Sequence, residues 1–190
     1  MGCRTYFDLK LRPDPDIPEW DRMGALWRFV HQASAASKTP FAVAFPEWMS
    51  AGFTLGTVLR VFTRSEDDAN AIYEGLESNP RCADLAEGTR VKSVKSDPAL
   101  FEAYRMHRLP SGVSKARRTV PLDVAQTLQA QARERRLAQQ ASYPFVVMRS
   151  STGHKFRLVV ERIAAQADAN GEPNGYGLSR TSQVVALPVV

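Results

Sequence analysis

A stretch near the C-terminal end of the sequence carries the side chains best suited to chemistry. Two apolar runs rich in β-branched residues, at 145–148 and 156–160, flank a polar turn in which Gly153 can adopt a positive φ. This pattern predicts a β-hairpin with a polar tip, and a tip of this kind suits the recognition of phosphate or sugar groups. The alternative is that Ser-Ser-Thr-Gly only forms the turn, since these residues bond their own backbone in turns. The hydroxyl, imidazole and basic residues at the tip are Arg149, Ser150, Ser151, Thr152, His154 and Lys155.

Charge is segregated along the chain, which carries +5 overall. Residues 1–88 hold 9 Lys and Arg against 13 Asp and Glu, net −4, whereas residues 89–190 hold 16 against 7, net +9. A basic half of this kind is typical of phosphate and nucleic-acid binding, although a merely solvated basic surface gives the same count.

Acid–base chemistry on RNA is the reaction type that these residues favour. Metal-dependent nucleases need clustered carboxylates, but the acids of the basic half are scattered singly, and the glycine patterns of nucleotide sites are absent. RNA supplies its own nucleophile, a 2′-hydroxyl, from which a histidine can take the proton. The three histidines are His31, His107 and His154, and each could equally be a structural or surface residue. We therefore expect no metal and no other cofactor.

Length and composition indicate a soluble protein of one large or two small domains. Of its 190 residues 44% are apolar, yet no run approaches the roughly 18 apolar residues of a membrane helix. The acidic N-terminal segment does not resemble a signal peptide. Cys3 and Cys82 are too few and too far apart for a disulfide framework or a zinc site, so we expect two thiols and a cytoplasmic protein.

The first half of the chain, residues 1–95, predicts a ferredoxin-like split βαβ domain. Residues 5–12 alternate like a half-buried strand, and apolar residues recur at helical spacing over 20–37, with His31 at the edge of the stripe. RNA-recognition domains share this architecture, but their aromatic stacking motif is missing. The elements that complete the order βαββαβ are strands at 41–45, 57–63 and 91–95 and a helix at 67–76 capped by Ser65.

The second half, residues 96–190, predicts a basic α+β domain. We expect an RNA-binding helix over 96–109, a long helix from 121 to about 142, the hairpin, and a closing strand over 184–190. A short basic segment that includes Arg117 and Arg118 lies between the two helices. The long helix carries further cations near its C-terminal end, at Arg133, Arg135 and Arg136.

Five short motifs follow one another in a specific order. They are Leu-Arg-Pro-Asp-Pro at 11–15, Val-His-Gln-Ala at 30–33, Lys-Ser-Asp-Pro at 95–98, Arg-Ser-Ser-Thr-Gly-His-Lys-Phe-Arg-Leu at 149–158, and Tyr-Gly-Leu-Ser at 176–179. Together they resemble the CRISPR repeat-processing endoribonucleases of type I-F (Csy-type) systems. Each motif is weak alone, but the resemblance spans nearly the whole chain.

The resemblance implies metal-independent cleavage at the 3′ base of a repeat hairpin, leaving a 2′,3′-cyclic phosphate and a 5′-hydroxyl. His31 matches the general base of the family, and Tyr176 matches the tyrosine that orients it. Ser150 matches the serine that holds the attacking ribose; because the family's turn is one residue longer, Ser151 is the alternative. Phe156 matches the aromatic residue that stacks beneath the terminal base pair.

The chain departs from the family in its arginines. In the family, the helix after Lys-Ser-Asn-Pro carries many arginines, whereas the matching stretch of this chain carries few. We therefore expect binding in the RNA groove to be weaker or differently placed, and cations elsewhere in the chain can offset the loss. The family's base-reading Arg-Val-Gln is approximated by Arg90-Val-Lys92, and lysine cannot accept a hydrogen bond as glutamine does. The residues we expect to bind RNA are Arg90, Lys92, Arg105, His107, Arg108, Arg117, Arg118, Arg149, Ser151, Thr152, Lys155 and Phe156.

The expected partners are the CRISPR repeat hairpin and the backbone and large subunits of a type I-F-like surveillance complex, with no membrane. Two other functions stay open. One is a structural cap that binds the RNA hairpin without cutting it. The other is an unrelated ferredoxin-like module for protein interactions.

Overall fold

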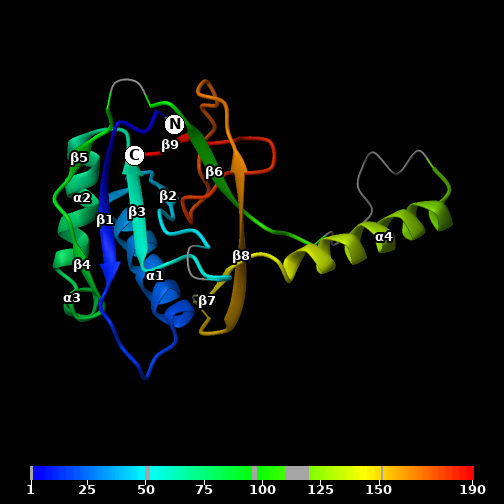
Figure 1. The fold of residues 1–190 in the computed structure, drawn as a ribbon, viewed down its shortest axis with the longest axis horizontal. Coiled ribbons are helices and arrows are strands. Elements are labelled where there is room, and N and C mark those ends of the chain that lie inside the picture. The colour runs from blue at the N-terminus through cyan, green and yellow to red at the C-terminus, as the bar shows by residue number, and fades with distance from the viewer. Residues whose placement is uncertain (1, 50–51, 96–97, 110–119, 151) are drawn as a thin grey trace.

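Each half of the chain builds one antiparallel sheet, and helix α1 (Glu19–Ser37) packs against elements of both halves (Figure 1). This computed structural model describes residues 2–49, 52–95, 98–109, 120–150 and 152–190. On one side α1 contacts α2 (Glu66–Glu77), and on another it runs along the edge strand β7 (Phe145–Arg149). The helix that carries His31 therefore faces the predicted hairpin.

The first sheet has the strand order β2-β3-β1-β4, and β5 also pairs with β1. All of these pairings are antiparallel, so the predicted split βαβ arrangement is confirmed. Ser65 caps α2 as predicted, because its side chain accepts a hydrogen bond from the Asp68 amide at 3.2 Å. The remaining elements of this half are β1 (Thr5–Leu11), β2 (Ala42–Ala44), β3 (Val58–Thr63), α3 (Pro80–Leu85), β4 (Ala86–Gly88) and β5 (Lys92–Ser93).

The second sheet has the order β7-β8-β6-β9. The predicted hairpin is confirmed: β7 pairs with β8 (Lys155–Ala164), and Gly153 in its turn has φ +86°. The closing strand is shorter than predicted, because only β9 (Leu187–Pro188) pairs with β6 (Phe101–Met106).

The predicted helix over 96–109 is wrong, since Phe101–Met106 in its described part forms strand β6. The sequence there is rich in Ala, Leu, Glu, Arg and Met, whose helix propensities favour a helix by less than about 1 kcal/mol per residue. Pairing with β8 on one side and β9 on the other outweighs that preference. The strand buries Ala103 and Tyr104, and the Tyr104 hydroxyl donates to Glu102 two residues away, at 2.7 Å.

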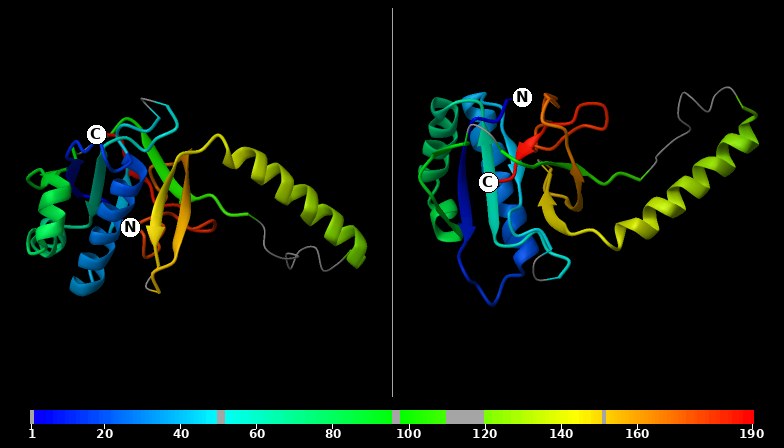
Figure 2. Two further views of the ribbon diagram at one scale, coloured as in Figure 1. Left: turned by 90° about the horizontal axis from the view of Figure 1, so that it is seen from below. Right: turned by 45° about the horizontal axis from the view of Figure 1, so that its top comes forward.

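Helix α4 (Leu122–Gln140) leaves the two sheets as an extended arm (Figures 1 and 2). The long helix expected from 121 to about 142 is thus confirmed. Only Ala125 is buried among its residues, and most of its side chains are polar and exposed. The helix also exposes four large apolar side chains, those of Leu122, Val124, Leu128 and Leu137.

One hydrophobic core runs through both halves of the chain. It joins Trp27 of α1 to Phe7 and Leu59 of the first sheet and to Val146 and Leu158 of the second. The division into domains at residue 95 stays a prediction. No disulfide joins the two cysteines, as predicted, and no helix in the described part of the chain is long and apolar enough to span a membrane.

Candidate functional site

His31 is held in one orientation by the chain segment that precedes Tyr176. Its Nδ1 lies 2.5 Å from the carbonyl oxygen of Gly175. A carbonyl can only accept, so Nδ1 carries the proton and Nε2 keeps its lone pair in the neutral ring. The described residues offer Nε2 no hydrogen bond. The ring is half-exposed and lies 5.2 Å from the Tyr176 ring, at an angle of 31°. Such a histidine is prepared to take a proton from a bound group.

The turn that contains Tyr176 is fixed by hydrogen bonds from several directions. The Asn174 side chain accepts from the amides of Tyr176 and Leu178, at 2.9 and 3.2 Å. The Trp27 indole, buried one turn before His31, donates to the Tyr176 carbonyl at 2.8 Å. Helix and turn are therefore joined on both sides of the His31 ring, and neither can shift without the other.

The hairpin tip is closed by Ser150. Its Oγ lies 2.8 Å from Thr152 Oγ1 and accepts from the His154 amide at 3.1 Å, while its backbone amide donates to the His154 carbonyl at 2.9 Å. The side chains of Thr152 and His154 are exposed. Ser150 thus takes part in the turn chemistry that the sequence suggested, while its hydroxyl stays half-exposed. Ser151, the alternative serine, lies outside the described residues.

The path of β7 along α1 brings the tip toward His31. Near the start of both elements, the Trp20 and Phe145 rings lie 6.0 Å apart. One turn later Gly24 faces the Val147 carbonyl, where any Cβ would clash with that oxygen. The next turn of the helix presents Arg28, which lines one cleft together with Arg149. Since His31 follows Arg28 by three residues, it lies next to Arg28 on the same face of the helix.

Phe156 pairs with Met148 across the hairpin. Phe156, which the resemblance matches to the residue that stacks beneath the terminal base pair, is half-buried and packs against the hydrophobic core. Its neighbours Arg149 and Lys155 are exposed and face each other in the same ladder. The hairpin therefore offers part of one aromatic ring on one face and cations on the other.

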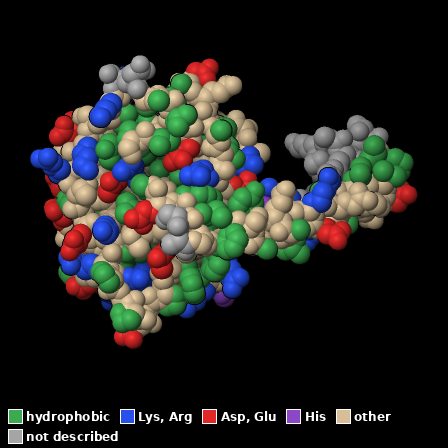
Figure 3. All heavy atoms as spheres, in the orientation of Figure 1, with side chains coloured by type: hydrophobic (Ala, Val, Ile, Leu, Met, Phe, Trp, Pro, Cys, Tyr) green, Lys and Arg blue, Asp and Glu red, His purple; other side chains and the backbone are tan. Residues whose placement is uncertain are grey.

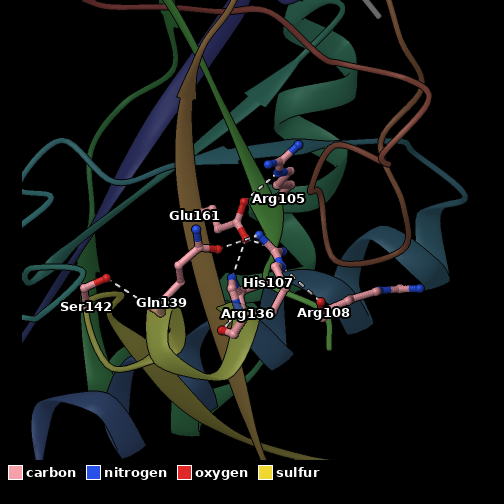
Figure 4. A network of polar contacts seen from close by, with 7 residues as sticks. All are labelled: Arg105, His107, Arg108, Arg136, Gln139, Ser142 and Glu161. Carbon is pink, nitrogen blue, oxygen red and sulfur yellow. Dashed lines mark hydrogen bonds and ion pairs between the residues drawn. The ribbon is translucent and has the colours of Figure 1, made fainter. Parts of the chain in front are cut away.

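Two of the predicted RNA-binding residues, Arg105 and His107, lie instead in a buried ionic network (Figure 4). Its centre is Glu161 of β8, which is 1% exposed and bonds Arg105 at 2.7 Å, His107 Nδ1, and Arg136 of α4. The other ring nitrogen of His107 lies 2.8 Å from the Arg136 carbonyl. Both nitrogens of His107 are thus engaged within the protein, which leaves none for a phosphate in this conformation.

The pKa of Glu161 reflects this network. Burial alone raises the pKa of the carboxyl, but hydrogen bonds from Arg105 and His107 and the charges of Arg105 and Arg136 hold it below its usual range. The network fastens the end of α4 to the second sheet. Arg136 comes from α4, whereas Arg105 lies in β6, His107 directly follows β6, and Glu161 lies in β8. Its evident role is to anchor the arm.

The other predicted RNA contacts are dispersed. Arg90 and Lys92 are exposed at the β5 side of the first sheet, opposite β2, and Figure 1 shows this edge far from the hairpin. Arg108 is exposed where the chain leaves β6 toward the arm. Arg117 and Arg118 lie outside the described residues. In the view of Figure 3, basic and acidic side chains are interspersed over the body of the molecule.

Three residues of the site were missed at the level of sequence. Gly175 gave no signal in the sequence, because it contributes a backbone carbonyl and every residue has one. Glu161 was hidden inside an apolar strand. Arg28 could have been found, since it precedes His31 by three residues and so lies next to it on the same helix. Among the described residues, no group of His, Cys, Asp and Glu is placed to hold a metal ion.

Comparison with known proteins agrees with the resemblance. The family model described as CRISPR-associated protein (Cas_Csy4) matches residues 6–189. The CRISPR-associated endonuclease Cas6/Csy4 of Pseudomonas aeruginosa (strain UCBPP-PA14) is 31% identical over 192 residues, which cover 92% of this chain and 95% of that protein. A solved structure described as an RAMP protein binding different RNA substrates covers 98% of this chain at 12% identity, with a TM-score of only 0.36. The chain therefore belongs to the Cas6/Csy4 family of CRISPR-associated endonucleases.

Proposed function

We propose that this protein binds the stem-loop of CRISPR repeat RNA and cleaves the precursor at the 3′ base of the hairpin without a metal ion. His31 is the base, Ser150 holds the attacking ribose, and Tyr176 orients His31. After the cut the protein stays on the RNA as the subunit at the crRNA 3′ end of a type I-F-like surveillance complex. Family membership removes the third candidate, an unrelated interaction module.

The single observation that carries the proposal is the bond between His31 Nδ1 and the Gly175 carbonyl. It leaves Nε2 as the nitrogen that can accept a proton. In the proposed step this nitrogen takes the proton of the ribose 2′-hydroxyl, the 2′-oxygen bonds to the adjacent phosphorus, and the bond from phosphorus to the 5′-oxygen breaks. The leaving oxygen acquires a proton and becomes a 5′-hydroxyl, and the other product ends in a 2′,3′-cyclic phosphate. No water molecule is consumed.

The proposal is tested by incubating the protein with its cognate repeat hairpin in EDTA, beside a His31→Ala variant. We expect cleavage by the natural protein and a rate reduced by about 10²–10⁴ in the variant, the usual contribution of a general base. Binding of the uncleaved RNA should stay within about threefold, since His31 contributes no charge-assisted contact in its neutral form. Equal cleavage rates for both proteins would overturn the assignment of His31.

A second candidate function is a structural cap that binds the RNA hairpin without cutting it. One observation favours it: the Ser150 hydroxyl already has two partners within its own turn, and a serine engaged in this way is less ready to hold a ribose. The same experiment separates the two, because tight binding with no cleavage by the natural protein would support the cap.

A further inference from the structure

A cleft between α1 and the hairpin lies next to His31 but has no part in the cleavage step described above. Its volume is about 260 Å³. The residues that matter for its chemistry are Asp21, Gly24 and Arg28 from the helix and Val147, Arg149 and Lys155 from the hairpin. We call it the α1–hairpin cleft.

The charge of this cleft is suited to an anion. Arg28, Arg149 and Lys155 supply three cations against the single carboxylate of Asp21. In the described part of the chain no ion pair joins any of the three to a carboxylate. Asp21 lies in the first turn of α1, where an acidic side chain suits the positive end of the helix dipole.

Arg28 also has an unsatisfied donor. Its Nε is buried and has no hydrogen-bond partner among the residues that the structure describes. A buried guanidinium N–H without a partner is unfavourable, and a phosphate oxygen satisfies such a donor while the fork geometry allows a second bond. The Arg28 guanidinium also lies 5.7 Å from the centroid of the Phe29 ring, and a bound phosphate would add a counter-charge beside it.

The hairpin separates this cleft from the Phe156 ring. Side chains of a strand alternate between its two faces, so Lys155 and Phe156 project in opposite directions. Arg149 pairs with Lys155 and Met148 pairs with Phe156, which puts both of these cations on the cleft side. A nucleic acid whose stem rests on the Phe156 side and whose cut lies at the Ser150 tip would continue onto the opposite face, toward Arg28.

We infer that the α1–hairpin cleft holds a backbone phosphate of the single-stranded RNA that continues in the 3′ direction past the cut. The inference rests on the proposed function, because it takes the stem side and the tip from it. The cleft binds the strand that leaves after cleavage, so it contributes to the affinity for precursor RNA and not to the affinity for the processed product. A contact worth about tenfold is too weak to hold the 3′ fragment once the backbone is cut, so the fragment departs while the hairpin stays.

The test compares two RNAs in direct binding measurements. One is the repeat hairpin ending at the expected cut, and the other continues for about six nucleotides beyond it, with a 2′-deoxy sugar at the cut to prevent cleavage. We expect the natural protein to bind the extended RNA about tenfold more tightly, the usual value of one charge-assisted phosphate contact. In Arg28→Ala this gain is lost, whereas Arg28→Lys keeps part of it because the charge remains.

Arg81→Ala serves as the matched control, since Arg81 is exposed on α3, away from the hairpin, and should change neither affinity. If Arg28→Ala lowers the affinity for both RNAs equally, the cleft binds the hairpin itself. If it lowers the affinity for neither RNA, the cleft binds no RNA. Either result overturns the inference. If the natural protein binds the hairpin but gains nothing from the extension, the inference fails alone. If it binds neither RNA, the proposed function fails with it.

Discussion

His31 is the residue on which the proposed activity depends. The groups around it orient the imidazole, whereas His31 itself takes the proton. The Gly175 carbonyl fixes the tautomer, the Tyr176 ring packs against the imidazole, and the Trp27 indole holds the turn that carries both. Of these contacts only the Tyr176 ring is a side chain that can be changed without altering the helix. It offers the clearest way to test positioning apart from proton transfer.

Replacement of Tyr176 should affect the cleavage rate through the ring more than through the hydroxyl. The contact with His31 is between rings, and a phenylalanine preserves it. We expect Tyr176→Phe to keep the rate within about threefold and Tyr176→Ala to reduce it by tenfold or more, roughly the cost of a slightly misplaced catalytic group. Single-turnover rates at saturating protein measure this, and similar rates for the two variants would contradict it.

At the scale of single residues, the sequence led to part of the site. Short motifs predict His31, Ser150 and Tyr176 as site residues, and the structure brings the first and last into contact. The sequence predicts that Arg105 and His107 bind RNA, and their sequence neighbours do not reveal the Glu161 carboxylate to which the structure joins both. Glu161 comes from a strand 54 residues further along the chain than His107, and pairing at that distance leaves no local pattern.

Among the secondary-structure elements, those with strong local signals were predicted correctly. Helix α2 begins at the expected serine cap, and the hairpin turns at the expected glycine. Strand β6 was mistaken for a helix because its residues favour a helix locally, whereas its pairing partners β8 and β9 follow far along the chain. A strand in the interior of a sheet is specified by those partners and less by its own residues.

Helix α4 has an unusual attachment, which makes it the element most sensitive to one substitution. It buries only Ala125, so its position relative to the sheets depends on the ionic network at its C-terminal end. Glu161→Gln should remove the charge that binds Arg105 and Arg136 and leave both cations partly buried without a counter-charge. We expect a loss of about 3–5 kcal/mol in the free energy of unfolding, as for other broken buried ion pairs.

Thermal or urea unfolding measures this loss, with Glu134→Gln as the control because Glu134 is exposed on the same helix. A change below about 1 kcal/mol in Glu161→Gln would contradict the anchoring role. The arm should also become easier to cleave with protease, since a helix without its anchor moves away from the sheet.

The same network predicts how stability depends on pH. The folded-state pKa of Glu161 is lowered, so its stabilisation is fully present above the ordinary glutamate pKa and is lost as pH falls through the folded value. We therefore expect the difference in unfolding free energy between the natural protein and Glu161→Gln to be constant from pH 6 to 7 and to shrink below about pH 4. A difference that grows as the pH falls would contradict the assignment.

For the whole molecule, charge is segregated more clearly along the sequence than over the surface. The half after residue 88 carries net +9, yet part of that charge is neutralised inside the network, and one face of the body shows both signs interspersed (Figure 3). Exposed cations lie on the hairpin, on α4, and elsewhere on the surface at Arg90, Lys92 and Arg108. The basic segment at 115–118 lies outside the described residues.

Salt dependence measures how many of these cations bind phosphates. Removing one cation that binds a phosphate lowers the slope of log affinity against log salt concentration by about 0.7–0.9. We expect Arg133→Ala combined with Arg135→Ala, both exposed on α4, to reduce the slope by about twice that value while leaving the single-turnover cleavage rate unchanged. An unchanged slope would show that the arm does not bind the RNA.

The measurement that tests the central claim most directly is the chemistry of the cut itself. The protein is incubated in EDTA with two repeat hairpins extended past the expected cut, one all-ribose and one with a single 2′-deoxy sugar at that position, and the fragment ends are identified by mass. We predict cleavage of the ribose substrate alone, with a 2′,3′-cyclic phosphate on one fragment and a 5′-hydroxyl on the other. Cleavage of the deoxy substrate, or cleavage that appears only when a divalent metal is added, would contradict the account.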